Sequence, residues 1–413
     1  MSTEKFKLAI VAPTAFFYQV ALFKELAEHP RLDLTVYFCS EEGLSGGDIF
    51  KKFNTKGKWG VEHELLDGYN YKFLTNYSPR PSYLNWPMGL VNPGIWGALK
   101  KQKLDGVVLM SWMNPTWWMA ILASMVNKFP IFYLTDTNVQ AEPLKPGWKS
   151  FLKRLLLRHF LFKITSGFLC VGEANKEFYK YHGVPDSKLV DFAFTWGYKS
   201  LLNKARELEP KREEIRSSLG IAKDARIILY CGRLSPEKSP FTLLEAFERL
   251  ELPGKTLIFV GDGKLRESLE TYTAKHGIES VHFVGFQNRP EIPKYYAAAD
   301  LLVVPSDREA TGGVINEAMC FKLPVIISDQ VGFGMDLVQE DVNGFSFPVG
   351  DPNSLAISIK RLFSLPEDER LEMGTQSLQR MTEWSERDLP GFLTRFLDDM
   401  ATCKDGPKTE HQA

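Results

Sequence analysis

The amino-acid sequence predicts an α/β fold made of two doubly wound domains that face each other across a central cleft. Short apolar runs recur along the chain without alternating polar residues, as in strands that are buried on both faces of a parallel sheet. Each run is followed by a turn and by a stretch with helical spacing, which is the order of β-α-β units. The runs fall into two series, and we therefore expect two such domains.

The expected strands follow the apolar runs. In the first series they are residues 8–13, 34–40, 106–111, 131–136 and 168–172. In the second series they are residues 227–232, 256–261, 281–286, 301–306 and 324–328. Residues 39–100 are rich in glycine and aromatic residues without a clear period, which leaves two alternatives, a long loop or a short hairpin insertion.

A charged segment without a strand signal, residues 198–212, separates the two series and leads into a helix that ends at Gly220. Beyond residue 350 the spacing of apolar residues is helical, and Asp351, Pro366 and Ser385 are the expected helix starts. The predicted division is an N-terminal Rossmann-like domain at 1–200, a C-terminal Rossmann-like domain at 201–384, a helix at 385–401 that packs back on the first domain, and a flexible tail at 402–413.

The composition is that of a globular protein, with 44% apolar and 24% charged residues in a chain of 413. Residues 1–200 hold 24 Lys and Arg against 17 Asp and Glu, whereas the remainder holds 26 against 34. This uneven charge suggests different partners for the two halves. Since no basic run is interleaved with a known nucleic-acid-reading module, nucleic acid is not among the expected partners.

The sequence predicts a cytoplasmic protein. Its five cysteines form no C-x-x-C pair, as expected of free thiols in a reducing compartment. The apolar run near the N-terminus is too short for a signal peptide, and the longest run, residues 117–134, is interrupted by Asn127, Lys128 and Pro130. The seven histidines have no metal-binding spacing.

Residues 145–163, KPGWKSFLKRLLLRHFLFK, are both basic and apolar. Such a helix could make peripheral contact with an anionic membrane, at its inner face. The alternative is a domain helix whose Lys and Arg side chains extend to water, because Lys149 and Lys153 fall far from Arg154 and Arg158 on a helical wheel.

Two glutamates, Glu309 and Glu317, bracket the start of a predicted helix that opens at Gly312-Gly313. The free N–H groups and the positive dipole end of a helix N-terminus attract phosphate, and carboxylates bind hydroxyl groups. Taken alone, Glu309 is more often a solvated loop residue. Glu317 lies among apolar residues, where a carboxylate needs a partner.

Three further segments end strands of the second series and should meet at the same edge of its sheet. Arg233 and Lys238 follow the first of these strands, and a guanidinium beside an ammonium group suits a diphosphate, although either could be an ordinary loop charge. Gly261-Asp262-Gly263 is a tight turn at which the backbone could approach a ligand, and residues 284–288 form the third strand end.

The order of these motifs resembles that in the retaining glycosyltransferases of family 4, which have two Rossmann-like domains in the GT-B fold. The motifs are Gly232-Arg233 with Glu237-Lys238, Gly261-Asp262-Gly263, VGF at 284–286, IPKYYAAADLLVVPS at 292–306, and E-x7-E at Glu309 and Glu317. The opening residues 12–29 also resemble the first loop and helix of a subgroup of that family. The resemblance covers nearly all of residues 7–400.

The resemblance implies a nucleotide-sugar donor site in the C-terminal domain. Arg233 and Lys238 would hold the diphosphate and stabilise negative charge on the leaving group. Glu309 would bind hydroxyl groups of the sugar, and Glu317 those of the ribose. The remaining donor-binding residues would be Gly232, Gly261 and Gly263, Phe286 beside the base, and Thr311, Gly312, Gly313 and Val314, whose N–H groups would face the sugar and the distal phosphate.

The reaction that the resemblance implies is transfer of a hexose-type sugar from a UDP- or GDP-sugar to a hydroxyl acceptor, with retention, in polysaccharide or glycolipid assembly. The departing phosphate oxygen would take the proton of a sugar or lipid-linked acceptor. No D-x-D motif occurs in the sequence, which fits a metal-independent enzyme without a cofactor. The alternatives are a sugar phosphorylase or synthase acting on a soluble sugar, and a non-catalytic nucleotide-sugar-binding protein.

The N-terminal domain would provide the acceptor side, and there the sequence departs from the family. The first loop lacks the glycines that many members have, so Phe16 and Tyr18 are expected to shape the acceptor side. Where many members have a histidine, this chain offers Asn114 or Trp112. Asp136 ends an expected strand and is either a cleft residue or a helix N-cap.

Overall fold

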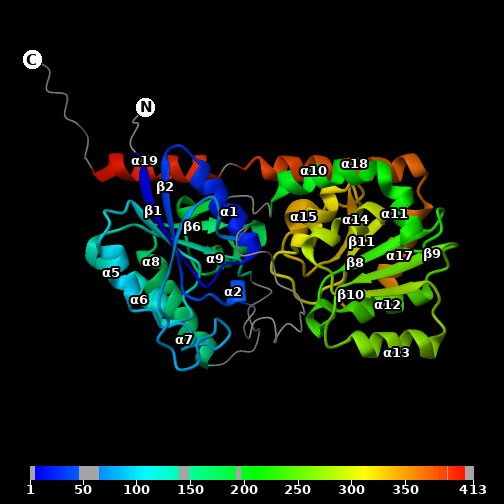
Figure 1. Ribbon diagram of the computed structural model, residues 1–413, viewed down its shortest axis with the longest axis horizontal. Coiled ribbons are helices and arrows are strands. Elements are labelled where there is room, and N and C mark those ends of the chain that lie inside the picture. The colour runs from blue at the N-terminus through cyan, green and yellow to red at the C-terminus, as the bar shows by residue number, and fades with distance from the viewer. Residues whose placement is uncertain (1–4, 46–64, 139–147, 192–196, 388, 405–413) are drawn as a thin grey trace, which may run out of the picture.

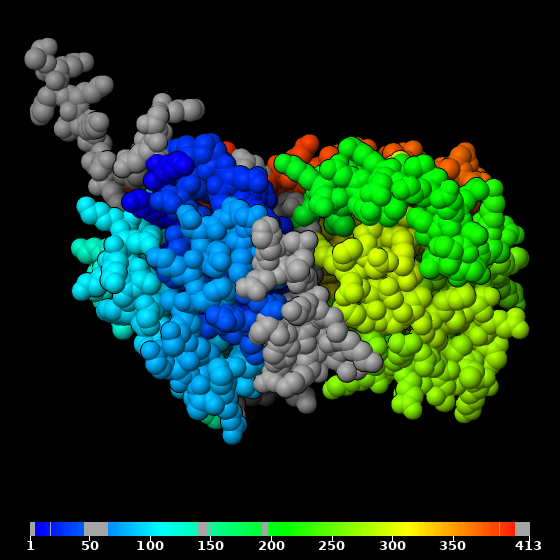
Figure 2. Space-filling view, viewed as in Figure 1, coloured from blue at the N-terminus to red at the C-terminus, as the bar shows by residue number. Residues whose placement is uncertain are grey.

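The computed structural model describes residues 5–45, 65–138, 148–191, 197–387 and 389–404. Within these residues it contains two parallel β-sheets that lie side by side, each flanked by helices (Figure 1). Figure 2 shows the resulting elongated molecule, with the first half in blue and cyan and the second in green to orange. The predicted fold of two Rossmann-like domains is confirmed.

The first sheet has the strand order β3-β2-β1-β4-β5-β6-β7, and its neighbouring strands are parallel. Its strands are β1 (Phe6–Ala12), β2 (Leu32–Phe38), β3 (Asn70–Phe73), β4 (Gly106–Leu109), β5 (Ile131–Thr135), β6 (Gly167–Cys170) and β7 (Leu189–Asp191). The surrounding helices are α1 (Phe17–Glu28), α2 (Glu42–Ser45), α5 (Gly94–Lys100), α6 (Pro115–Asn127), α7 (Trp148–Leu156), a π-helical turn η1 (Leu157–Leu161), α8 (Phe162–Ile164) and α9 (Glu173–Tyr181).

The second sheet has the order β10-β9-β8-β11-β12-β13 and is likewise parallel. Its strands are β8 (Arg226–Cys231), β9 (Lys255–Val260), β10 (Val281–Gly285), β11 (Leu301–Val304), β12 (Val325–Ser328) and β13 (Gly344–Phe347). Its helices are α10 (Tyr198–Leu208), α11 (Arg212–Ser218), α12 (Pro240–Arg249), α13 (Arg266–His276), α14 (Pro293–Ala298), α15 (Gly313–Cys320), α16 (Gly334–Leu337), α17 (Pro352–Ser364), α18 (Glu367–Ser385) and α19 (Leu389–Lys404).

Every predicted strand is present, and three short strands that were not predicted complete the two sheets. β3 is an edge strand with three exposed residues, so it carries no continuous apolar run. It pairs in parallel with β2, and the hairpin alternative for residues 39–100 is therefore wrong for the described part of that region. β7 is only three residues long and ends in an exposed aspartate, and β13 contains the exposed Ser346, so neither carries a continuous apolar run.

Helix α18 starts after Pro366 as predicted, but the boundary between the last two helices and the end of the last one differ from the prediction. Ser385 does not start a helix, because its hydroxyl donates to the carbonyl of Thr382 at 2.7 Å within the last turn of α18. The next helix begins at Leu389 with a proline in its first turn, a position where proline costs no hydrogen bond, and continues to Lys404 instead of ending at residue 401.

Helix α19 lies along the first sheet, as its red ribbon in Figure 1 shows. Its Asp398 carboxylate accepts two hydrogen bonds from the Arg31 guanidinium, both at 2.7 Å. Its Phe396 ring meets Phe132 of β5 edge-on, with the centroids 5.6 Å apart. Helix α10 thus belongs to the second half, where it packs on α14 and α15, and α19 returns the chain to the first half.

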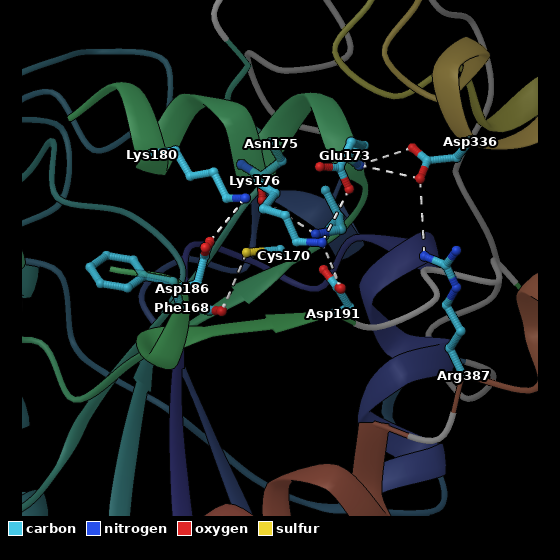
Figure 3. A network of polar contacts seen from close by, with 11 residues as sticks. Phe168, Cys170, Glu173, Asn175, Lys176, Lys180, Asp186, Asp191, Asp336 and Arg387 are labelled. Atoms are coloured by element: carbon cyan, nitrogen blue, oxygen red, sulfur yellow. Dashed lines mark hydrogen bonds and ion pairs between the residues drawn. The ribbon is translucent and has the colours of Figure 1, made fainter. Parts of the chain in front are cut away.

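A second contact between the halves is made by Asp336 of α16, at the start of α9 (Figure 3). Its carboxylate accepts the backbone N–H of Glu173 at 3.0 and 3.3 Å, and the Arg387 guanidinium lies 4.0 Å away. An anion is favoured at this helix N-terminus. Only 6% of the Asp336 side chain is exposed, and burial raises its pKa to about 6 despite the N–H bond and Arg387, which lower it.

The described helices do not include one that is long and apolar enough to cross a bilayer. Among the described cysteines, Cys39, Cys170, Cys231 and Cys320 are free thiols.

We predict that replacing Asp336 by Asn removes a pH dependence of stability. The folded protein holds a proton on Asp336 up to about pH 6, whereas the unfolded chain releases it near 3.8, so folding binds a proton between these values. The free energy of unfolding of the wild type should therefore fall relative to Asp336→Asn as pH rises from 4 to 7, by on the order of 2–3 kcal/mol. Urea unfolding at several pH values measures this difference, and parallel profiles for the two proteins would contradict it.

Candidate functional site

Lys238 and Glu309 form an ion pair at the edge of the second sheet that faces the first. Lys238 ends a short 3₁₀ turn (Pro236–Lys238) between β8 and α12, and Glu309 lies in the loop between β11 and α15. Because β8 and β11 are neighbouring parallel strands, their carboxyl ends bring these loops together. The Lys238 ammonium donates to Glu309 Oε2, and the two side chains are only 20% and 15% exposed.

The glycines at the ends of β8 and β9 allow their loops to pack directly against each other. The Gly232 N–H donates to the carbonyl of Val260 at 2.9 Å. A Cβ on Gly261 would lie 1.9 Å from the Gly232 carbonyl oxygen, so no other residue fits there, and a Cβ on Gly263 would lie 2.3 Å from the carbonyl oxygen of Leu234. Arg233 follows and forms a 3.4 Å ion pair with Glu237.

The start of α15 is held in place by the loop that follows β12. The Gly332 N–H donates to the Glu309 carbonyl at 3.0 Å, and the Phe333 N–H donates to the Thr311 carbonyl at 2.9 Å. Gly312 caps the helix with a left-handed φ of 88°, and a Cβ there would lie 2.9 Å from Val331. Thr311 is buried, whereas Gly313 and Val314 are partly exposed at the helix start.

Glu317 lies about one turn inside α15 and accepts a hydrogen bond from the Tyr296 hydroxyl of α14 at 2.8 Å. Burial raises the pKa of Glu317, while the charge of Arg289 and the Tyr296 bond act in the opposite direction. Arg289 belongs to the segment after β10 that also contains Phe286. The segment predicted to meet a base and the carboxylate predicted to meet a ribose therefore lie near each other.

Asp136 faces Glu309 from the first sheet. It directly follows β5 and is open to solvent, although the surrounding protein crowds its carboxyl group. Burial raises the pKa of Asp136, and the negative charge of Glu309 raises it further. The next described helix, α7, begins only at Trp148, so Asp136 is not the N-cap of a described helix. Two carboxylates from different halves thus face the same space.

Tyr18 and Tyr83 line the Asp136 side of the cleft. Burial, followed by the charges of Asp136 and Tyr83, raises the pKa of Tyr18 well above its ordinary value. The Phe16 ring stacks on Tyr18 with centroids 5.3 Å apart and meets Tyr83 edge-on at 5.7 Å. Asn114, by contrast, is buried, and its amide oxygen accepts the N–H of Leu90 at 3.2 Å, so that it supports a neighbouring loop.

Asn138, which was not among the predicted site residues, connects the two halves at the site. Its buried side-chain amide donates to the carbonyl oxygens of Glu309 and Ala310, both at 3.3 Å. The loop that carries it is fixed by α9, because the Asn175 amide donates to the Thr137 carbonyl at 2.5 Å. The sequence did contain a signal for Asn138, because it is a polar residue just beyond the end of an expected strand, two positions after Asp136.

Tyr83 and Tyr296 were also missed. Tyr83 lies in the region that the sequence left open, and its backbone N–H donates to Glu42 at 2.8 Å. Tyr296 belongs to a motif used for the family resemblance, but nothing in the sequence gave it a partner. Across the described ranges, no three His, Cys, Asp or Glu side chains are grouped so that they could hold a metal ion.

Comparison with known proteins relates the chain to enzymes that transfer sugars. A family described as "Glycosyl transferases group 1" matches residues 211–380. The putative teichuronic acid biosynthesis glycosyltransferase TuaC of Bacillus subtilis is 39% identical over 308 residues, which is 73% of each protein. An uncharacterized glycosyltransferase of Methanocaldococcus jannaschii is 35% identical over 151 residues, which is 36% of this chain and only 38% of that protein.

Among solved structures, Anabaena HepE in complex with UDP superposes with a TM-score of 0.69. It is 18% identical in sequence, and the match covers 97% of this chain and 100% of HepE. At this identity the similarity concerns the fold alone.

We predict that Lys238→Met destabilises the protein by about 1–3 kcal/mol, because Glu309 is left half-buried, unpaired and facing Asp136. The double variant Lys238→Met/Glu309→Gln should recover most of this loss. Urea unfolding of both single variants and the double variant measures the coupling.

Lys204→Met is the matched control, since its 2.8 Å pair with Glu207 is 40% and 51% exposed and should not change stability measurably. Equal effects of Lys238→Met and Lys204→Met would contradict a role of the pair in the site.

Proposed function

Because the chain belongs to the group 1 glycosyltransferases, we propose that it transfers a hexose-type sugar from a UDP- or GDP-sugar to a hydroxyl acceptor with retention of configuration. The observation that carries this proposal is the half-buried pair of Lys238 and Glu309 beside the N-terminus of α15, with Asp136 opposite. A cation, a helix N-terminus and carboxylates in one cleft suit a ligand with both phosphates and hydroxyl groups.

In this proposal the half at 201–384 binds the donor. Arg233 and Lys238 hold the diphosphate, the N–H groups at Thr311 to Val314 face the sugar and the distal phosphate, and Glu309 accepts hydrogen bonds from sugar hydroxyls. Glu317 binds the ribose near Phe286. HepE, which has this fold, has been crystallised with UDP and with UDP-glucose, and this supports a uridine nucleotide.

Lys238 would change partners during the reaction. Without donor it is neutralised by Glu309, whereas a diphosphate with more negative charge would compete for it. Glu309 would then be released toward the sugar hydroxyls. As the sugar–oxygen bond breaks, Arg233 and Lys238 stabilise the charge on the departing phosphate. That oxygen takes the proton of the acceptor hydroxyl on the same face of the sugar, so the reaction needs no separate protein base.

The half at 1–200 would bind the acceptor, with Phe16, Tyr18 and Asp136 lining its side of the cleft. The relation to a protein named for teichuronic acid biosynthesis supports an acceptor in polysaccharide assembly. A lipid-linked acceptor in glycolipid assembly fits the same geometry. The proposed location is the cytoplasm, or the inner face of the membrane.

The first test is transfer itself. Purified protein should release UDP or GDP from one nucleotide-sugar, and Glu309→Ala should lower this rate at least ~100-fold, because a contact to the reacting sugar is lost. The control is Glu279→Gln, which changes an exposed carboxylate that is not among the proposed site residues, and it should release the nucleotide at the wild-type rate. Wild-type turnover in Glu309→Ala would refute the assigned role.

Two further readouts separate the alternatives. Dependence on inorganic phosphate would indicate a phosphorylase, and binding without turnover a non-catalytic protein. The anomeric configuration of the product, compared with the donor by NMR, tests retention.

We also predict that transfer survives EDTA. The proposed charge stabilisers are Arg233, Lys238 and the N-terminus of α15, and the predicted site contains no D-x-D motif. Initial rates with and without EDTA should agree within about twofold, as removal of a catalytic cation would cost far more. Loss of activity that only Mg²⁺ or Mn²⁺ restores would overturn the metal-independent mechanism.

A further inference from the structure

Helix α7 exposes its apolar side chains instead of burying them. Trp148 and Phe151 are 72% and 67% exposed, and Leu152, Leu155 and Leu156 are also exposed. At about 100° per residue these five positions fall on one stripe of the helix. Buried apolar side chains first appear at Leu157 and Leu161 of η1, which directly follows α7. A helix that served only to pack against its domain would bury this stripe.

The exposed stripe continues onto the neighbouring helix. The Phe160 ring stacks on Trp118 of α6 with centroids 6.4 Å apart. From Trp118 the exposed residues Leu122, Met125 and Val126 follow along one face of α6. Figure 1 shows α6 and α7 next to each other at one end of the first half. We call this surface of α6 and α7 the apolar band.

The charged residues of these helices are all of one sign. The segment 148–164 holds five Lys and Arg and no Asp or Glu, and residues 115–127 of α6 hold no charged residue. By helical spacing, Arg154 lies on one flank of the α7 stripe, and positions 149 and 153 lie on the other. From the sequence alone, the wide separation of these basic positions favoured a domain helix. Because the stripe between them is exposed, the same separation places them on its opposite edges.

We propose that the apolar band binds the surface of an anionic lipid bilayer. Apolar side chains along the centre would enter the boundary between headgroups and acyl chains, and the flanking cations would meet the lipid phosphates. Neighbouring exposed apolar side chains, on helices whose own charged residues are all basic, match such a surface in both respects. A second copy of this chain would bring two basic borders together, which charge repulsion disfavours.

The apolar band lies close in sequence to the acceptor side of the cleft. Helix α7 starts ten residues after Asn138, whose side chain reaches the backbone of Glu309. If the proposed function holds, a bilayer on the apolar band would present a lipid-linked acceptor beside Asp136. The binding itself does not depend on that function.

The test is flotation of the full chain with phosphatidylcholine vesicles, with and without phosphatidylglycerol, in the absence of donor. The wild type should bind the anionic vesicles, and Phe151→Ser/Leu152→Ser should bind them at least tenfold more weakly. Arg154→Gln/Arg158→Gln should lose the preference for anionic lipid. Ile357→Ser/Leu371→Ser, on similarly exposed apolar residues of α17 and α18, is the matched control and should bind as the wild type does.

Unchanged circular dichroism and thermal midpoints, together with unchanged nucleotide release from the donor, would show that the variants fold and keep their cleft. Equal vesicle binding by Phe151→Ser/Leu152→Ser and the wild type would overturn the proposal. Self-association that this variant abolishes, without any vesicle binding, would also overturn it and assign the apolar band to a second copy. Because flotation needs no turnover, an inactive enzyme that still binds vesicles would refute only the proposed function.

Discussion

The loop that carries Glu309 is the point on which the geometry of the cleft depends. Its side chain pairs with Lys238, and its backbone carbonyl accepts bonds from Gly332 and from Asn138 of the other half. The position of one carboxylate is therefore fixed by β8, by the loop after β12 and by the first sheet together. The ion pair is partly shielded from water, so each charge would be costly alone. This arrangement keeps both charged groups in place at the edge of the second sheet.

Helix α9 of the first half supports two of the contacts that the described residues make between the halves. Helix α9 fixes the loop of Asn138 through Asn175, and its own N-terminus is capped by Asp336 from the second half. Both contacts across the interface thus share one rigid element, while α19 adds a third on the far side. A motion that breaks one of the α9 contacts must displace the other.

The sequence predicted the two sheets because continuous apolar runs report burial on both faces, and this signal is local. It missed β3 because an exposed edge strand has no such run. The grouping of Arg233, Lys238, Glu309 and Glu317 at one sheet edge followed from their places at strand ends. The pairing of Lys238 with Glu309 and the reach of Asn138 to Glu309 could not be predicted, because they depend on strand order and on how the halves meet. Whether Asp136 is a helix N-cap could not be predicted either, because this depends on where the next described helix, α7, begins.

Gly172 lies directly against Asp336, the residue of the second half that caps α9. The backbone of Gly172 is extended, with φ of 164°, and any residue could adopt it. A Cβ at this position would lie 2.7 Å from Asp336 Oδ2 and 3.5 Å from Phe333, so a side chain there would push the carboxylate aside. The carboxylate would then move away from the N–H group of Glu173 that it accepts. A single codon at position 172 would thus be enough to loosen one of the fastenings between the halves, with both sheets left intact.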